Sequence, residues 1–183
     1  MSKILYAAST MSHINNFHTA YIDALRRDGH EVKVMARGEG ADFDIPFVKK
    51  MLSYKNTSCR REIKRIIERE KFDAVVLNTA LAAFHIRLAM SKKNRPKVVN
   101  ISHGYLFGEK TSSLKEKILL ACEKYLAPRT DSVIVMNDED MRIAIDNRLS
   151  KNPPLMILGM GATTPPEAST RDEIRRELLS DDA

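Results

Sequence analysis

Long hydrophobic runs and tryptophan are absent from this sequence of 183 residues, and it has only two cysteines. Tryptophan is absent, and apolar runs such as 74–77 and 118–122 are far shorter than the roughly 20 residues that a membrane-spanning helix needs. Cys59 and Cys122 lie far apart, with no metal-ligand spacing around either, so we expect free thiols. Met1 leads into a strand-like run without a signal peptide. These absences predict a cytoplasmic globular protein.

Glycine is missing from the loop that follows the first predicted strand. No glycine occurs before Gly29, whereas a dinucleotide-binding turn needs the pattern G-x-G-x-x-G so that the backbone can approach a pyrophosphate. The phosphate-loop pattern of nucleoside triphosphatases is absent as well. We therefore do not expect hydride transfer from a dinucleotide or phosphate-loop hydrolysis.

Basic residues outnumber acidic ones, 30 to 24, and the formal net charge is +6. This balance favours an anionic partner, such as nucleic acid, a phosphorylated ligand or an acidic membrane surface. The aromatic residues comprise 5 tyrosines and 6 phenylalanines, and none is placed as a stacking platform for bases. With no recognition motif present either, we expect no nucleic-acid partner.

A charged helix predicted over residues 58–70 carries a concentration of basic side chains. Arg60 and Lys64 are one helical turn apart, as are Arg61 and Arg65, and they lie beside a stripe of isoleucines. A positive face next to an apolar stripe suits a helix that lies on anionic lipid. A solvated charged helix is the alternative interpretation. The four residues are therefore candidate membrane-facing side chains.

Apolar runs and helical periodicity alternate along most of the chain. This alternation predicts an α/β fold, a Rossmann-like three-layer α/β/α arrangement with a mostly parallel sheet. The expected strands are 3–8, 31–36, 43–48, 72–77, 96–101, 131–136 and 155–158, and the expected helices are 14–28, 58–70, 81–90, 114–126 and 138–149.

The composition of the sequence changes near its end. We expect residues 1–160 to form one Rossmann-like domain, followed by a linker that contains Pro165 and Pro166. Thr170 then begins a capping-box-like sequence and an amphipathic helix. Residues 161–183 are accordingly predicted to be a linker and the first helix of a second, truncated domain. The alternative is a helix that folds back on the first domain.

Polar side chains cluster in the loops that follow the predicted strands. In an open parallel sheet these loops, at the carboxyl ends of the strands, bind ligands. The first loop offers hydroxyl, amide and imidazole groups, which suit sugars, although the same groups could instead cap helices. The candidate substrate-binding residues are Ser12, His13, Asn16, Asn78, Thr79, Gly104 and Asn137.

Histidine is the most informative residue type in these loops. His103 directly follows a buried strand and precedes Gly104, which lets a ligand approach closely. We interpret His103 as a ligand contact or a proton-transfer group, and a turn histidine bonded to the backbone is the alternative. His13 and His18 lie five residues apart, but without further ligands around them they do not predict a zinc site.

The order and spacing of several short motifs resemble the N-terminal domain of GT-B glycosyltransferases of family four. The resemblance covers nearly the whole chain, and no single motif carries it. The matching segments are 3–6, 12–14, 17–18, 21, 25, 29–32, 78–79, 82–83, 103–104, 123–124, 130–131, 137, 139–140, 158–162 and 171–182.

The resemblance implies one half of a two-domain enzyme that uses a nucleotide-activated sugar as co-substrate, usually with retention and without a metal or other cofactor. The N-terminal domain would hold the saccharide acceptor and the missing C-terminal domain the nucleotide, so this chain alone would be inactive. His103 would be the catalytic residue near the transferring sugar, with Ser12 and His13 on the acceptor side. Bacterial members often build capsular, exopolysaccharide or lipopolysaccharide chains. A lipid-linked acceptor and a peripheral location at the inner face of the plasma membrane are therefore hypotheses.

Two other functions stay open. A nucleotide-sugar epimerase-like GT-B enzyme would share the fold but make a different product, so product analysis separates it from a transferase. A non-catalytic Rossmann-like module for sugar or protein binding would lack a second domain, so the reading frame beyond Ala183 separates it from both enzymes.

Overall fold

The computed structural model describes residues 1–51, 53–108 and 113–157. The predicted linker and helix at 161–183 lie outside the described residues. In the described part the strands are β1 (Lys3–Thr10), β2 (Glu31–Arg37), β3 (Phe43–Asp44), β4 (Ala74–Leu77), β5 (Lys97–Ile101), β6 (Ser132–Val135) and β7 (Leu155–Met156). The helices are α1 (Met11–Phe17), α2 (Thr19–Arg27), α3 (Asn56–Glu70), α4 (Ala80–Ala89), α5 (Leu114–Leu126), the short 3-10 helix η1 (Ala127–Arg129) and α6 (Asp138–Asp146).

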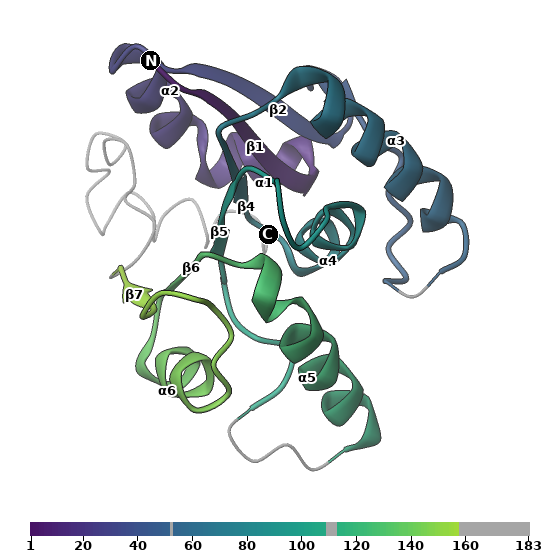
Figure 1. The fold of residues 1–183 in the computed structure, drawn as a ribbon, viewed down its shortest axis with the longest axis vertical. Helices are drawn as coiled ribbons and strands as arrows, with labels where there is room; N and C mark the ends of the chain where they lie inside the picture. The colour runs from purple at the N-terminus through teal and green to yellow at the C-terminus, as the bar shows by residue number, and fades with distance from the viewer. Residues whose placement is uncertain (52, 109–112, 158–183) are drawn as a thin grey trace, which may run out of the picture.

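The strands form one seven-stranded sheet in the order β3-β2-β1-β4-β5-β6-β7, and every adjacent pair is parallel (Figure 1). The prediction of a Rossmann-like fold with a parallel sheet is confirmed. The chain order reverses beside β1, because β2 pairs with one edge of β1 and β4 with the other. Ligands bind at such a reversal in open α/β sheets, outside the carboxyl ends of the strands.

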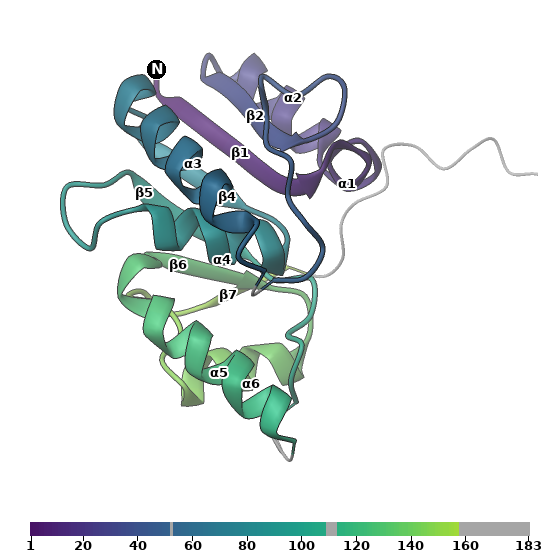
Figure 2. The same ribbon diagram turned by 90° about the vertical axis from the view of Figure 1, so that its right-hand side faces the viewer.

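Helices cover the sheet on both sides (Figures 1 and 2). Successive side chains of a strand point to opposite faces, and β1 shows this clearly. Tyr6 packs on the α1–α2 face with Ile14 and Ile22, whereas Leu5 packs on the α3–α4 face with Ile63. Each fully buried aliphatic side chain contributes about 1.5–3 kcal/mol, so the two clusters hold β1 in a fixed position between the layers.

The predicted helix over 14–28 is the main difference from the sequence-based expectation. It is split into α1 and α2 at His18, whose backbone leaves helical geometry with φ −127° and ψ −6°. Thr10 starts α1 earlier than expected, since its Oγ1 accepts a hydrogen bond from the His13 amide at 3.4 Å. The His18 ring is fully buried and contacts Tyr6, so the break lies at a residue whose side chain enters the core.

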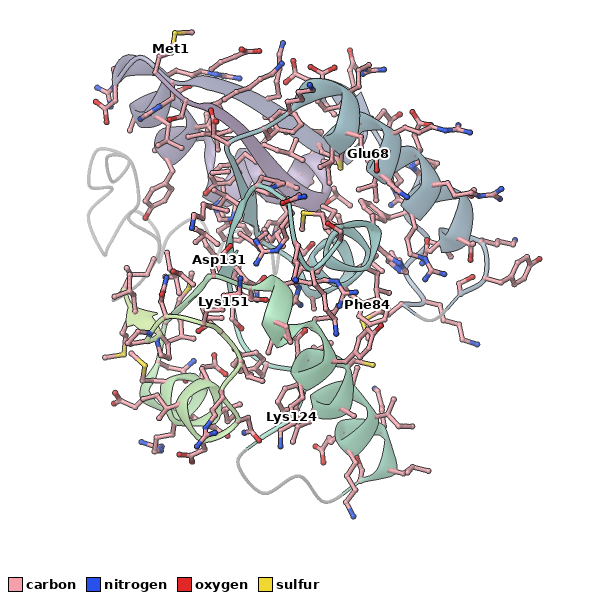
Figure 3. The ribbon with its side chains drawn as sticks, viewed as in Figure 1. Met1, Glu68, Phe84, Lys124, Asp131 and Lys151 are labelled. Carbon is pink, nitrogen blue, oxygen red and sulfur yellow. The ribbon has the colours of Figure 1, made fainter. Side chains whose placement is uncertain are left out.

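Asp131, just before β6, is an electrostatic anchor of the second half of the sheet. It accepts hydrogen bonds from Arg95, from the Val98 amide at 2.8 Å and from Lys151 Nζ at 3.2 Å, and Figure 3 labels it next to Lys151. Burial by itself would raise the pKa of this carboxyl, but these donors lower the pKa well below its usual range. The anchor joins the starts of β5 and β6 to the segment before β7.

Among the described residues, no helix combines the length and the apolar character that crossing a bilayer requires.

Candidate functional site

A cavity of about 240 Å³ lies where the carboxyl ends of β4 and β5 meet α4 and α5. Small-molecule pockets usually enclose about 300–1,000 Å³. The cavity is smaller than this, as expected if it is only one side of a larger cleft. Apolar side chains such as Leu106, Phe107 and Leu119 supply much of the lining. The predicted site residues that line the cavity are His13, Asn78, Thr79, His103 and Gly104.

The loop after β5 presents His103 to this cavity. The Ser102 amide donates to the Ile134 carbonyl at 2.8 Å, which extends the pairing with β6 just past the end of β5. Gly104 then takes φ +128°, a conformation that other residues rarely adopt. The turn therefore requires a glycine, and it leaves His103 exposed at the rim of the cavity.

His13 and His18 lie next to His103, although the three residues come from two distant parts of the chain. The ring centroids of His13 and His103 are 4.9 Å apart, and those of His18 and His103 are 5.2 Å apart. His18 Nε2 lies 3.2 Å from His13 Nε2, and His18 Nδ1 lies 3.0 Å from the Tyr6 hydroxyl. A continuous polar chain thus runs from Tyr6 in the core to the cavity.

All three imidazoles in this group are held in the neutral form near pH 7. Burial, followed by the neighbouring His13 and His103, lowers the pKa of His18 to about 3. Burial and His103 lower the pKa of His13, with a hydrogen bond to the Asn78 backbone acting in the opposite direction. Burial also lowers the pKa of His103. A neutral imidazole can accept a proton or a hydrogen bond from a sugar hydroxyl.

Asn78 and Thr79 form the floor of the site between β4 and α4. The Asn78 amide nitrogen Nδ2 donates to the Ala7 carbonyl at 3.1 Å, while its Oδ1 has no hydrogen-bond partner among the described residues. An unpaired buried acceptor is costly unless a ligand or water satisfies it. Thr79 Oγ1 accepts from the Ser9 amide at 2.9 Å, which fixes the first loop against this floor.

A buried ion pair that the sequence analysis missed closes the inner end of the cavity. Arg87 donates through both terminal nitrogens to Glu123, at 2.9 and 2.8 Å, and one of them also donates to Thr130 Oγ1 at 3.2 Å. The Arg87 side chain is only 1% exposed. Its signal in the sequence is a single charged residue within the mostly apolar helix that was predicted over 81–90.

Three other predicted binding residues lie outside the lining of this cavity. Ser12 and Asn16 are exposed on α1. Asn137 caps α6, because its Oδ1 accepts from the Asp140 amide at 2.8 Å, and it borders a separate hollow beside Gly104. Their part in binding stays a prediction, and the remaining five site residues are those that the fold brings together.

The four candidate membrane-facing residues all belong to α3 but do not form one free positive face. Lys64 and Arg65 lie 3.7 and 3.5 Å from Glu68 and Glu62 of the same helix. Arg60 is half-buried and donates a hydrogen bond to Thr57 Oγ1. Together with Arg61 and Lys64 it lines a wide groove. The groove lies at the amino ends of β4 and β5, away from the cavity.

Comparison with known proteins places the sequence in a family. Residues 16–154 match the model of Glycosyltransferase Family 4. The chain is 28% identical over 146 residues to "Putative glycosyltransferase EpsD" of Bacillus subtilis (strain 168), covering 75% of the chain and 38% of that protein. It is 29% identical over 94 residues to "Uncharacterized 41.2 kDa protein in cps region" of Klebsiella pneumoniae, covering 49% of the chain and 26% of that protein. The chain therefore spans well under half the length of both relatives.

Several solved structures have a similar fold. The Staphylococcus aureus MnaA–UDP co-structure matches with a TM-score of 0.67 at 14% identity, over 97% of this chain and 52% of that one. Sucrose-phosphate synthase from Thermosynechococcus elongatus matches with a TM-score of 0.59 at 12% identity, over 98% and 96%. At these identities the likeness shows the fold alone, one half of the GT-B type. Because the family model matches most of the sequence, the chain belongs to glycosyltransferase family 4.

Proposed function

We propose that this chain is the acceptor-side half of a glycosyltransferase that moves a sugar from a nucleotide-sugar donor to a saccharide acceptor in surface polysaccharide synthesis. The main observation in support is that one cavity at the carboxyl edge of the sheet is lined by His13, Asn78, Thr79 and His103. The name of the Bacillus subtilis relative and the cps region of the Klebsiella pneumoniae relative support the assignment to polysaccharide synthesis.

The groups at the cavity fit a sugar hydroxyl better than a charged ligand. Asn78 Oδ1 is a buried acceptor that a hydroxyl donor would satisfy. His103 is a neutral imidazole at the rim, where it can take a proton from a hydroxyl or hold one by a hydrogen bond. The apolar side chains of Leu106 and Phe107 offer a surface for the carbon face of a sugar ring. His103 is therefore proposed as the catalytic residue, with the nucleotide held by a part of the protein beyond this chain.

A membrane surface is the proposed location of the acceptor, and α5 supports it more strongly than α3 does. Leu114, Ile118 and Tyr125 form an exposed stripe on α5, with exposed fractions of 74%, 44% and 58%. The exposed Lys117 and Lys124 flank the stripe. Apolar residues bordered by lysines suit the surface of an anionic bilayer. Because α5 also lines the cavity, a lipid-linked acceptor could reach the site from that surface.

The test uses the full-length protein with a panel of nucleotide sugars and membrane extracts as acceptor. Wild-type protein should transfer label from one donor, and His103→Ala should reduce the rate by about 10²- to 10⁴-fold, as loss of a general base does. Asn78→Asp keeps the size of the side chain but places a charge at the cavity floor, and it should weaken acceptor binding. The proposal would be overturned if the full-length protein transferred label from no donor and the His103→Ala variant behaved like the wild type in the protein's physiological assay.

A nucleotide-sugar epimerase is the second candidate, favoured by the similar fold of UDP-GlcNAc 2-epimerase from Neisseria meningitidis. That match has a TM-score of 0.62 at 16% identity, over 84% of this chain and 45% of that one. Incubation of the full-length protein with UDP-GlcNAc and no acceptor separates the two functions. Formation of an epimeric nucleotide sugar supports the epimerase, and an unchanged donor supports the transferase.

A further inference from the structure

Three imidazoles meet at the rim of the cavity, and their geometry is that of a metal-binding site. His13, His18 and His103 each offer one ring nitrogen, and the three nitrogens all lie within 4.8 Å of one another. Two nitrogens bound to tetrahedral zinc at about 2.0–2.1 Å lie about 3.3–3.4 Å apart. The 3.2 Å between the Nε2 atoms of His13 and His18 is already close to this spacing.

The buried member of the group is held in place from behind. The His18 ring is fully buried, and its Nδ1 lies 3.0 Å from the Tyr6 hydroxyl, which leaves Nε2 directed at His13. A hydroxyl can either donate or accept, so Tyr6 supports whichever tautomer of His18 is present. When Nε2 binds a metal, Nδ1 carries the proton and donates a hydrogen bond to the Tyr6 hydroxyl oxygen. Such partners behind a ligand histidine orient the ring and raise metal affinity.

The other two imidazoles supply the adjustable part of the group. His103 is exposed on the loop after β5, and His13 is half-buried on α1. Because its ring is exposed, His103 is the ligand that would move to bring its nitrogen to the spacing of a tetrahedral site. Imidazole binds a metal through a ring nitrogen that carries no proton. Three protein ligands leave the fourth tetrahedral position open.

We propose that His13, His18 and His103 form a three-histidine site for a divalent transition metal of the zinc class. The ion would lie at the rim of the cavity that His13 and His103 line, and its open position would be accessible to water or to an oxygen of a bound ligand. The proposal goes beyond the proposed function and does not depend on it, because it concerns binding by the chain alone. With the ion bound, His103 would be a ligand, and the proton of a sugar hydroxyl would be taken in the metal-free state.

The test is direct titration of the tag-free chain, freed of metals with a chelator, with ZnCl₂ by calorimetry and with CoCl₂ by visible absorption. We expect one ion per chain and a tetrahedral cobalt spectrum without the thiolate charge-transfer band that Cys122 would give. His13→Ala and His103→Ala should each weaken binding by about 100-fold or more. A rise in melting temperature with zinc, lost in both variants, should accompany binding.

His30→Ala is the matched control, since His30 contacts the Ser2 amide and lies outside the three-histidine group. It should bind zinc as the wild type does. Absence of saturable binding up to about 100 μM zinc, or binding that persists in both His13→Ala and His103→Ala, overturns the proposal. None of these three readouts uses glycosyl transfer, so a failure of metal binding does not affect the outcome of the transfer assay.

Discussion

At the scale of single residues, Arg87 and Glu123 decide whether the inner end of the cavity keeps its shape. The guanidinium is almost fully buried, and the carboxylate that it contacts through both oxygens is 15% exposed. A buried charge whose partner is removed keeps its desolvation cost without compensation. The pair also joins α4 to α5, so its loss would disturb the cavity as well as the stability.

Replacing one member of this pair should cost more than replacing both. Glu123→Leu is expected to lower the free energy of unfolding by about 3–5 kcal/mol, because it leaves Arg87 buried and unpaired. The double variant Arg87→Met with Glu123→Leu should recover most of that loss. Urea unfolding of the wild type, both single variants and the double variant measures the coupling. Costs that simply add would show that the two side chains do not depend on each other.

The individual site residues show what sequence reasoning reached and what it missed. His13, Asn78 and His103 were predicted because strand ends of a parallel sheet meet at one edge, and this rule needs no side-chain detail. The contact of His18 with the other two histidines was not predicted, since it follows from the break between α1 and α2 and from the tertiary contact of His18 with the Tyr6 hydroxyl. The Arg87–Glu123 pair joins residues 36 positions apart and follows only from the packing of two helices.

At the scale of the elements, α3 and α5 offer two different surfaces for a membrane. Both helices cover the same side of the sheet and face the viewer in Figure 2. The basic residues of α3 are partly neutralised by glutamates of the same helix, whereas α5 combines exposed apolar and lysine side chains. Apolar contact supplies binding strength and basic residues supply salt sensitivity, so the two helices should contribute in distinguishable ways.

Vesicle binding separates these contributions. The chain should bind vesicles that contain anionic lipid, and binding should weaken as salt rises. Leu114→Ser with Ile118→Ser should abolish most of it, while charge reversal of Arg60, Arg61, Lys64 and Arg65 to glutamate should mainly reduce its salt dependence. Ile145→Ser, an exposed isoleucine on α6, is the matched control and should bind normally. Full binding by both multiple variants would reject the membrane surface.

The bounds of the elements were predicted best where local signals are strong. Helix α5 spans Leu114–Leu126 as expected, because Ser113 and Glu116 form a capping box at its start. Strand β3 is only two residues long, against an expected 43–48, since it pairs with β2 alone at the edge of the sheet. Edge strands receive support from one neighbour only, and their length is set by that pairing rather than by local propensity.

At the scale of the whole molecule, the histidine group and Asp131 make stability depend on pH. The unfolded chain binds a proton at each histidine near pH 6.5, whereas folded His18 stays neutral until about pH 3. Between these values the unfolded state holds more protons, so acid favours unfolding. Asp131 has a lowered pKa, so its contribution is present above about pH 4 and is lost at still lower pH.

Unfolding by urea at several pH values, with a metal chelator present, should show stability falling as pH drops below about 6.5. The slope should reach up to about 1.4 kcal/mol per pH unit for each histidine that stays neutral in the folded state. His18→Gln removes one titrating ring, so the variant should be less stable at pH 7.5 but lose less on going to pH 5. Parallel pH curves for the two proteins would show that His18 does not cause the effect.

The central position of β1 bears on how the chain folds while the ribosome synthesises it. Strand β1 leaves the ribosome before β2 and β4, with both of which it pairs, so its β4 edge stays unpaired until residues 11–73 have followed. At about 5–20 residues per second this interval lasts about 3–13 s. During that time an apolar strand edge is open to pairing with other nascent chains. Slowed translation between β2 and β4 should therefore increase aggregation, whereas a pause after β4 should not.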